Sequence, residues 1–156
     1  MKKNDKAKLR EVIKMTEKGE KKKDENALMW EEPGVYWVRA DKEKNRIELF
    51  FQGKLKKSEQ LRNLPEHVRK AVAELKDGLQ VLSSGHEIEG NPGFGITRPF
   101  MEGQKLIMAK KPSKIATTTT KLGHKMVVNV LTKLTGMTSK VFDTEEKAKA
   151  WLDKEE

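Results

Sequence analysis

Residues 33–53 read PGVYWVRADKEKNRIELFFQG, and this stretch decides the fold class. After the turn signal Pro33-Gly34, residues 35–40 form a run rich in aromatic and β-branched side chains, which is typical of a strand. Residues 46–52 alternate in polarity, with Ile47, Leu49 and Phe51 on one face. The polar residues 41–45 join the two runs, so the pattern predicts a β-hairpin.

Helical and strand patterns alternate after the hairpin. Apolar residues at helical spacing predict helices near 61–77, 99–111, 122–135 and 143–152. Shorter apolar runs predict strands at 79–83, 115–118 and 139–142, with a loop at 86–95. We expect Thr97 to be the N-cap of the second helix, and Asp143 with Glu146 to form a capping box for the last one. The order predicts an α/β fold: a single-domain mixed sheet of about five strands, starting with the hairpin and covered by about four helices.

Composition and charge set the boundaries of the domain. Residues 1–28 carry ten Lys/Arg and six Asp/Glu, which predicts a charged tail or marginal helix, and residues 29–156 form the α/β domain. The chain has no cysteine, which excludes disulfides and thiol nucleophiles. No apolar run reaches the ~18 residues of a membrane span, and no signal-peptide core follows Met1, so we expect a cytoplasmic protein.

Most of the positive charge lies in one block of the sequence. Residues 103–142 contain eight lysines and no Asp or Glu, while the whole chain has a formal net charge of +9. Close cations of one sign repel each other, so a folded surface of this kind favours an anionic partner. The expected partner surface consists of Lys105, Lys110, Lys111, Lys114 and Lys125. A solvated face that only aids solubility is the alternative interpretation.

Four segments resemble the STAS superfamily, in its SpoIIAA-like branch. Residues 115–120 are similar to the family's fourth strand, 126–136 (MVVNVLTKLTG) to its third helix, and 141–152 (VFDTEEKAKAWL) to its closing strand and helix. Residues 46–53 resemble the second strand, which ends in Gly. The resemblance covers about residues 35–152 and implies a non-enzymatic interaction domain.

The resemblance also implies a possible switch, because anti-sigma-factor antagonists of this superfamily bind a kinase partner and are switched by phosphorylation of a Ser or Thr at the start of the second helix. The matching region here is 93–98 (GFGITR), in which the Asp and both Ser of the family motif are missing. Thr97 is the residue that could replace the phospho-acceptor. Ser83-Ser84-Gly85 mimics the motif, but it lies too early in the chain.

A second candidate site lies at the rim of the predicted sheet. Parallel sheets bind ligands beyond the carboxyl ends of their strands, and helix N-termini offer free N–H groups to anions. Hydroxyls and cations are expected to meet there, in a site for a small anionic ligand. Its residues are Thr97, Arg98, Thr118, Thr119, Thr120, Lys121 and His124. The alternative interpretation is purely structural: the threonines end a strand and cap the helices that follow, without binding a ligand.

Other constellations lead to exclusions. His86-Glu87-Ile88-Glu89 would split its ligands between two strand faces, so we expect no metal site, no cofactor and no catalytic residues. Phe50 beside Phe51 leaves open an exposed apolar hairpin face, which would suit a homodimer or a lipid groove. The lysine block has no Arg and only Phe142 as an aromatic residue, which disfavours specific nucleic-acid recognition.

The sequence therefore favours a non-enzymatic binding or regulatory module that recognises an acidic or phosphorylated protein through its lysine-rich face. An anionic membrane surface is an alternative target of the same lysines. A carrier or sensor of a small anionic or amphipathic ligand at the sheet rim is the alternative function. General nucleic-acid binding through phosphate contacts is a weaker third hypothesis.

Overall fold

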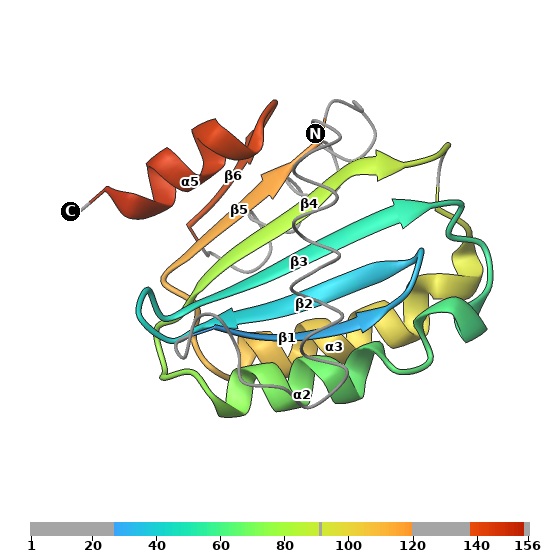
Figure 1. The fold of residues 1–156 in the computed structure, drawn as a ribbon, viewed down its shortest axis with the longest axis horizontal. Coiled ribbons are helices and arrows are strands. Elements are labelled where there is room, and N and C mark those ends of the chain that lie inside the picture. The colour runs from blue at the N-terminus through green and yellow to red at the C-terminus, as the bar shows by residue number, and fades with distance from the viewer. Residues whose placement is uncertain (1–26, 91, 120–137, 155–156) are drawn as a thin grey trace.

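The computed structural model describes residues 27–90, 92–119 and 138–154. One six-stranded sheet runs through this part of the chain, and its strands lie side by side in sequence order (Figure 1). The strands are β1 (Ala27–Glu32), β2 (Tyr36–Asp41), β3 (Arg46–Gly53), β4 (Gln80–Ile88), β5 (Lys114–Thr118) and β6 (Ser139–Phe142). The first three strands pair antiparallel, and β3 to β6 pair parallel.

Three α-helices and two short 3-10 turns are described. The elements are η1 (Ser58–Leu61), α2 (Leu64–Ala73), η2 (Phe94–Ile96), α3 (Thr97–Met108) and α5 (Glu145–Asp153). The chain crosses from β3 to β4 through α2 and from β4 to β5 through α3, which gives the predicted parallel arrangement. The predicted mixed α/β sheet is thus confirmed. The predicted helices in 1–28 and 122–135 lie outside the described residues.

The sheet has one strand more than predicted. β1 begins at Ala27, so residues 27 and 28 belong to the sheet and not to the charged tail. Leu28 and Met29 are buried, and β1 pairs with β2 along its whole length. The strand begins with a run of four apolar residues instead of an alternating pattern, and a charged stretch precedes it, so the strand was not predicted.

The main core lies between the sheet and the layer formed by α2 and α3. Val38, Ile47 and Leu49 point from the hairpin into this core and meet Val68 of α2 and Ile107 of α3. We call this side of the sheet the α2/α3 face and the opposite side the α5 face. Strand alternation is the reason why the predicted apolar set of β3 lies on a single face.

The hairpin does not expose an aromatic surface. Phe50 and Phe51 lie on opposite faces, and both are buried. Phe50 stacks on Trp37 with ring centroids 5.5 Å apart, while Phe51 packs against Tyr36 and Phe100. Among the described residues, Met101 on α3 is the exposed large apolar side chain, at 45% exposure. Phe50 and Phe51 therefore do not form the exposed aromatic face that was considered, while the possible homodimer stays a prediction.

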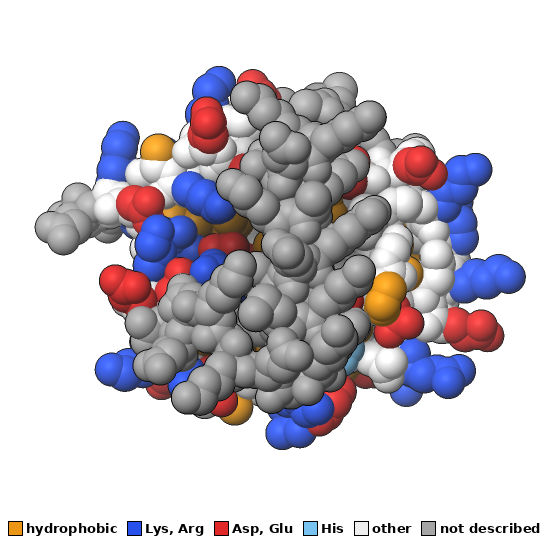
Figure 2. Space-filling view, viewed as in Figure 1, with side chains coloured by type: hydrophobic (Ala, Val, Ile, Leu, Met, Phe, Trp, Pro, Cys, Tyr) orange, Lys and Arg blue, Asp and Glu red, His pale blue; other side chains and the backbone are white. Residues whose placement is uncertain are grey.

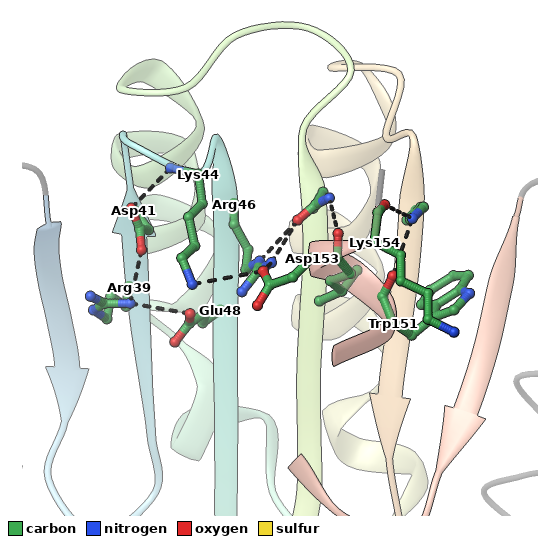
Figure 3. A network of polar contacts seen from close by, with 11 residues as sticks. Arg39, Asp41, Lys44, Arg46, Glu48, Trp151, Asp153 and Lys154 are labelled. Atoms are coloured by element: carbon green, nitrogen blue, oxygen red, sulfur yellow. Dashed lines mark hydrogen bonds and ion pairs between the residues drawn. The ribbon is translucent and has the colours of Figure 1, made fainter. Parts of the chain in front are cut away.

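A buried arginine fixes α5 to the other side of the sheet (Figure 3). Arg46 is 1% exposed, and its Nε and Nη2 atoms donate to Gln80 Oε1 at 3.0 and 2.8 Å. The same guanidinium pairs with Asp153 at the end of α5, and Gln80 Nε2 donates to the Leu152 carbonyl at 2.6 Å. β3, β4 and α5 are thus connected by one polar cluster, because a buried cation needs its donors satisfied.

The segment between β4 and α3 differs from the predicted loop in two ways. β4 continues to Ile88, and its pairing with β3 becomes irregular between Phe50 and Gln52, which is typical of a β-bulge. The Gly93-x-Gly95 fragment then packs directly on the backbone that follows β3. A Cβ atom on Gly95 would lie 2.5 Å from the Lys56 carbonyl oxygen, so glycine at this position permits a close backbone approach.

Candidate partner-binding surface

The lysine block is divided between the two sides of the sheet. Lys105 lies exposed on α3, and Lys110 and Lys111 follow in the turn after that helix. Lys110 is partly buried, and its Nζ donates to the Leu75 carbonyl at 3.1 Å, near the end of α2. Lys114 lies on the α5 face, and Lys125 is outside the described residues. A contiguous block in the sequence therefore does not form one contiguous surface.

Lys114 was predicted to belong to the partner surface, and its placement contradicts this. The residue is only 7% exposed, and its Nζ donates to the carbonyls of Trp151 and Lys154 at 3.1 and 2.8 Å. The ammonium also lies 5.3 Å from the centroid of the Trp151 ring. Cations stabilise the carbonyl end of a helix, so Lys114 anchors the last turn of α5.

Charge is nevertheless segregated in space. We call residues 54–77 and 97–111, which contain η1, α2 and α3, the helical layer. This layer carries eleven Lys/Arg and five Asp/Glu, a formal excess of six positive charges. The other described residues carry nine Lys/Arg and eleven Asp/Glu, an excess of two negative charges. Figure 2, which has the orientation of Figure 1, shows basic and acidic side chains interspersed around the margin of the visible side.

Ion pairs neutralise only part of the helical layer. Glu66 accepts from Arg69 Nε at 2.9 Å, and this bond holds the pKa of Glu66 below its ordinary value. Arg98 Nε lies 3.3 Å from a carboxylate oxygen of Glu102, one turn along α3. A third acid of the layer is paired with a lysine outside it: the Lys42 Nζ–Glu74 Oε2 distance is 2.9 Å.

Several exposed lysines of the layer, including residues of both α2 and α3, form no ion pair within the described part of the chain. Lys70 on α2, Lys105 on α3 and Lys111 after α3 form no ion pair with any residue in the described part of the chain. Lys111 is held in a left-handed backbone conformation, with φ at 53°, where α3 ends. The available positive charge therefore comes from both helices of the layer.

The predicted site at the sheet rim is not assembled by the described residues. Thr97 is exposed at the first position of α3, and Ile96, not Thr97, is the N-cap because the 3-10 turn η2 runs directly into the helix. The Arg98 side chain is 91% exposed. Thr118 and Thr119 are both buried.

Thr118 points to the side of the sheet opposite Thr97. Its Oγ1 donates to Ser84 Oγ at 3.0 Å, and Ser84 Oγ donates to Glu145 Oε1 at 3.0 Å at the start of α5. This enclosed chain connects β5, β4 and α5, whereas α3 covers the other face. Thr120, Lys121 and His124 of the predicted site lie outside the described residues. The sequence did not single out Ser84 for this bond, because only the strand register places it beside Thr118.

The final helix is capped one residue later than predicted. Thr144 is its N-cap, and its hydroxyl accepts a hydrogen bond from the Lys147 N–H at 3.2 Å. The predicted capping box with Asp143 at the N-cap is therefore wrong, although the predicted helix is present. With Thr144 at the cap, Glu145 occupies the first helical position and can receive the bond from Ser84.

His67 and His86, the histidines of the described ranges, are not grouped for metal binding. In the described ranges, no cluster of three His, Cys, Asp or Glu side chains could hold an ion. His67 instead faces Tyr36, with 2.8 Å between its Nδ1 and the phenol oxygen. Burial, together with the positive charge of Lys70, lowers the pKa of His67, which favours the neutral ring and lets its Nδ1 accept a hydrogen bond from the Tyr36 hydroxyl. His86 Nε2 is buried and has no hydrogen-bond partner among the described residues.

Comparison with known proteins adds information on the fold. No protein-family model matches the chain, and no curated protein does. A solved structure is similar: an uncharacterized protein from the DUF3478 family with a SpoIIAA-like fold, from Shewanella loihica PV-4. The likeness has a TM-score of 0.57 over 81% of this chain and 91% of that chain. The fold is SpoIIAA-like. At 15% sequence identity, the comparison extends to the fold alone.

The helices themselves are short and amphipathic. The longest, α3, has 12 residues, and within the described ranges no helix is long and apolar enough to cross a membrane.

Proposed function

We propose that this SpoIIAA-like domain is a non-enzymatic binding or regulatory module that recognises an acidic or phosphorylated protein through the helical layer. The observation that carries the proposal is the separation of charge, with a positive excess of six on this layer and a negative excess of two elsewhere in the described chain. A surface of this kind attracts acidic partners over about one Debye length, ~8–10 Å at physiological salt.

The contact residues of this proposal are the exposed lysines of α2 and α3. Lys70, Lys105 and Lys111 have no carboxylate partner among the described residues, so an acidic partner would not have to break an existing ion pair. Both helices are fixed by the main core through residues such as Val68 and Ile107. Their lysine backbones are therefore held in place before binding, which reduces the ordering cost of association.

Two features favour a protein partner over an anionic membrane. Met101 is the exposed large apolar side chain of the described residues, and one methionine gives little insertion into lipid. The acids of the layer, including Glu66 and Glu102, are interspersed with the cations, which suits a patterned protein surface better than a uniformly anionic bilayer.

The proposal can be tested with a defined probe. A fluorescent ten-residue peptide of alternating Glu and phosphoserine would be titrated with the full chain, and anisotropy recorded from about 50 to 300 mM salt. We expect binding that weakens steadily with salt, and a loss of ~10-fold or more in the double variant Lys105→Glu/Lys111→Glu, since each reversal replaces an attraction by a repulsion.

A matched control separates local recognition from net charge. Lys44→Glu/Lys149→Glu makes the same change in net charge on exposed residues outside the helical layer. We expect this variant to bind within about threefold of the unmodified chain, because screening weakens charges beyond ~10 Å. Equal losses in both double variants, or no binding of the peptide at about 50 mM salt, would refute the proposed surface.

A further inference from the structure

The edge of the molecule formed by β6 and α5 holds a second group of lysines, arranged around an indole ring. Trp151 of α5 is partly exposed and packs on Phe142 of β6, with ring centroids 5.6 Å apart. Two ammonium groups lie near its ring: Lys114 Nζ at 5.3 Å and Lys140 Nζ at 5.5 Å from the centroid. Lys114 is fixed by its bonds to the end of α5, whereas Lys140 is exposed on the strand.

Helix geometry adds two further lysines to this group. At 3.6 residues per turn, Lys147 lies one turn before Trp151 on the same flank of α5, and Lys154 is the C-cap residue, three positions after Trp151. The acids Glu145 and Asp153 lie on the other flank, where they bond to Ser84 and Arg46. Figure 3 shows this division: Asp153 points toward Arg46 of β3, and Trp151 lies on the side toward β6.

The lysines of this flank have no acidic partner in the described chain. Lys140, Lys147 and Lys154 are exposed and form no ion pair with the described residues. Phe142 is the aromatic residue within the lysine block, and α5, a separate element, adds Trp151 beside it. The combination of an accessible aromatic ring with several cations distinguishes this edge from the helical layer, whose exposed apolar side chain is Met101.

We propose that this edge binds single-stranded nucleic acid, with one base against Trp151 and the flanking phosphates on Lys140, Lys147 and Lys154. Single strands bind by base stacking on aromatic side chains and by backbone contacts with cations. The Lys140 ammonium must leave the ring when a base enters. This exchange costs little free energy, because an exposed cation–π contact is weak and the released ammonium then contacts a phosphate. A duplex fits less well, since its bases are not free to stack on the indole.

Fluorescein-labelled dT10 and rU10 would be titrated with the full chain, and anisotropy measured. We expect binding at about 50 mM salt, with a log–log salt slope near −2, as three neutralised phosphates on a single strand require. Lys140→Glu/Lys154→Glu should weaken binding by ~10-fold or more. Trp151→Leu keeps an apolar side chain against Phe142 but removes the stacking surface, and it should weaken binding by ~5-fold or more.

Lys149→Glu, on the other flank of α5, and Lys105→Glu/Lys111→Glu, on the helical layer, are the controls. Both should bind dT10 within about threefold of the unmodified chain, because their charges lie away from this edge. The inference fails if Trp151→Leu binds normally while its circular dichroism and melting temperature match the unmodified chain. It also fails if a ten-base-pair duplex competes as well as dT10, or if the helical-layer variant loses binding as strongly as Lys140→Glu/Lys154→Glu. Should Trp151→Leu be misfolded, quenching of indole fluorescence by dT10 in the unmodified chain, abolished in Lys140→Glu/Lys154→Glu, decides in its place.

Discussion

Two glycine-to-alanine substitutions should change the stability of this protein in opposite directions. At Gly95 an added Cβ would lie 2.5 Å from the Lys56 carbonyl oxygen, a distance that real Cβ atoms essentially never show. The obstacle is backbone and cannot rotate away, and the adjoining Leu55 is buried and accepts a hydrogen bond from the Gly93 N–H at 2.7 Å. Overpacking of this kind costs about 1–3 kcal/mol, only partly offset by the ~0.4–1 kcal/mol that alanine contributes by restricting the unfolded chain.

At Gly103 the same methyl group fits. The position is buried inside α3, and the added Cβ would lie 3.5 Å from Val68 Cγ2 and 3.8 Å from Leu64 Cγ, both ordinary contacts. Alanine is more favourable than glycine in a helix interior by about 0.5–1 kcal/mol, so Gly103→Ala should be stabilising.

The two variants control for each other, because both replace glycine by alanine and so change the unfolded chain alike. At about 2–4 °C per kcal/mol for a chain of this size, Gly95→Ala should melt about 3–8 °C below the unmodified protein and Gly103→Ala about 1–4 °C above it. Urea titration monitored by circular dichroism should show the same order in transition midpoints with unchanged slopes. If Gly95→Ala is as stable as the unmodified chain, the close approach of the two loops is not tight, and our account of Gly93-x-Gly95 is wrong.

Two further predictions concern buried polar groups. Lys114→Met should lower the free energy of unfolding by about 1–3 kcal/mol in urea titration, because the α5 carbonyls lose a charged donor. Lys111→Met, at an exposed position, is the control and should change the free energy of unfolding by less than ~0.5 kcal/mol. Equal effects of the two substitutions would contradict the structural role of Lys114. Burial keeps the pKa of His67 in the folded protein below its ordinary value. As the pH falls below about 6.5, the unfolded chain therefore takes up a proton at this residue before the folded chain does. The free energy of unfolding should thus decrease from about pH 6.5 toward pH 5. His67→Gln, which retains an acceptor for the Tyr36 hydroxyl, should have a flatter stability profile between pH 7 and 5, and a profile parallel to that of the unmodified chain would count against this coupling.

Periodicity was sufficient to predict most of the fold. The strand predicted at 46–52 is β3, and the strand predicted at 139–142 is β6, because their side chains alternate or lie between clear turn signals. β1 was missed because its core residues, Leu28 and Met29, follow a charged stretch without alternation. The predicted strand 79–83 stopped too early, because Ser83-Ser84-Gly85 is typical of a turn. In the structure, pairing with β3 on one side and β5 on the other keeps this segment in β4.

The candidate sites were less predictable than the elements. Lysines that are close in sequence can lie on opposite sides of the sheet. Lys114 of β5 points toward α5, whereas Lys105 is exposed on α3, which covers the other face. The contact between Trp151 and Lys140 joins residues of different elements, and no spacing in the sequence encodes it. Thr97 and Thr118 were expected at one rim of the sheet, because Thr97 lies at a helix N-terminus and Thr118 at the carboxyl end of a strand. In the structure, α3 and the Thr118 side chain lie on opposite faces of the sheet.

The strict sequence order of the six strands has a consequence for biosynthesis. Each strand from β2 onward pairs with the strand that precedes it in the chain, so a growing polypeptide can extend the sheet at its free edge without displacing a neighbour already in place. The contacts of α5 do not follow this order, and its bond from Asp153 to Arg46 joins residues 107 positions apart. A nascent chain that does not yet contain α5 would thus expose the guanidinium of Arg46 without the Asp153 carboxylate, and packing of α5 on the sheet supplies that partner.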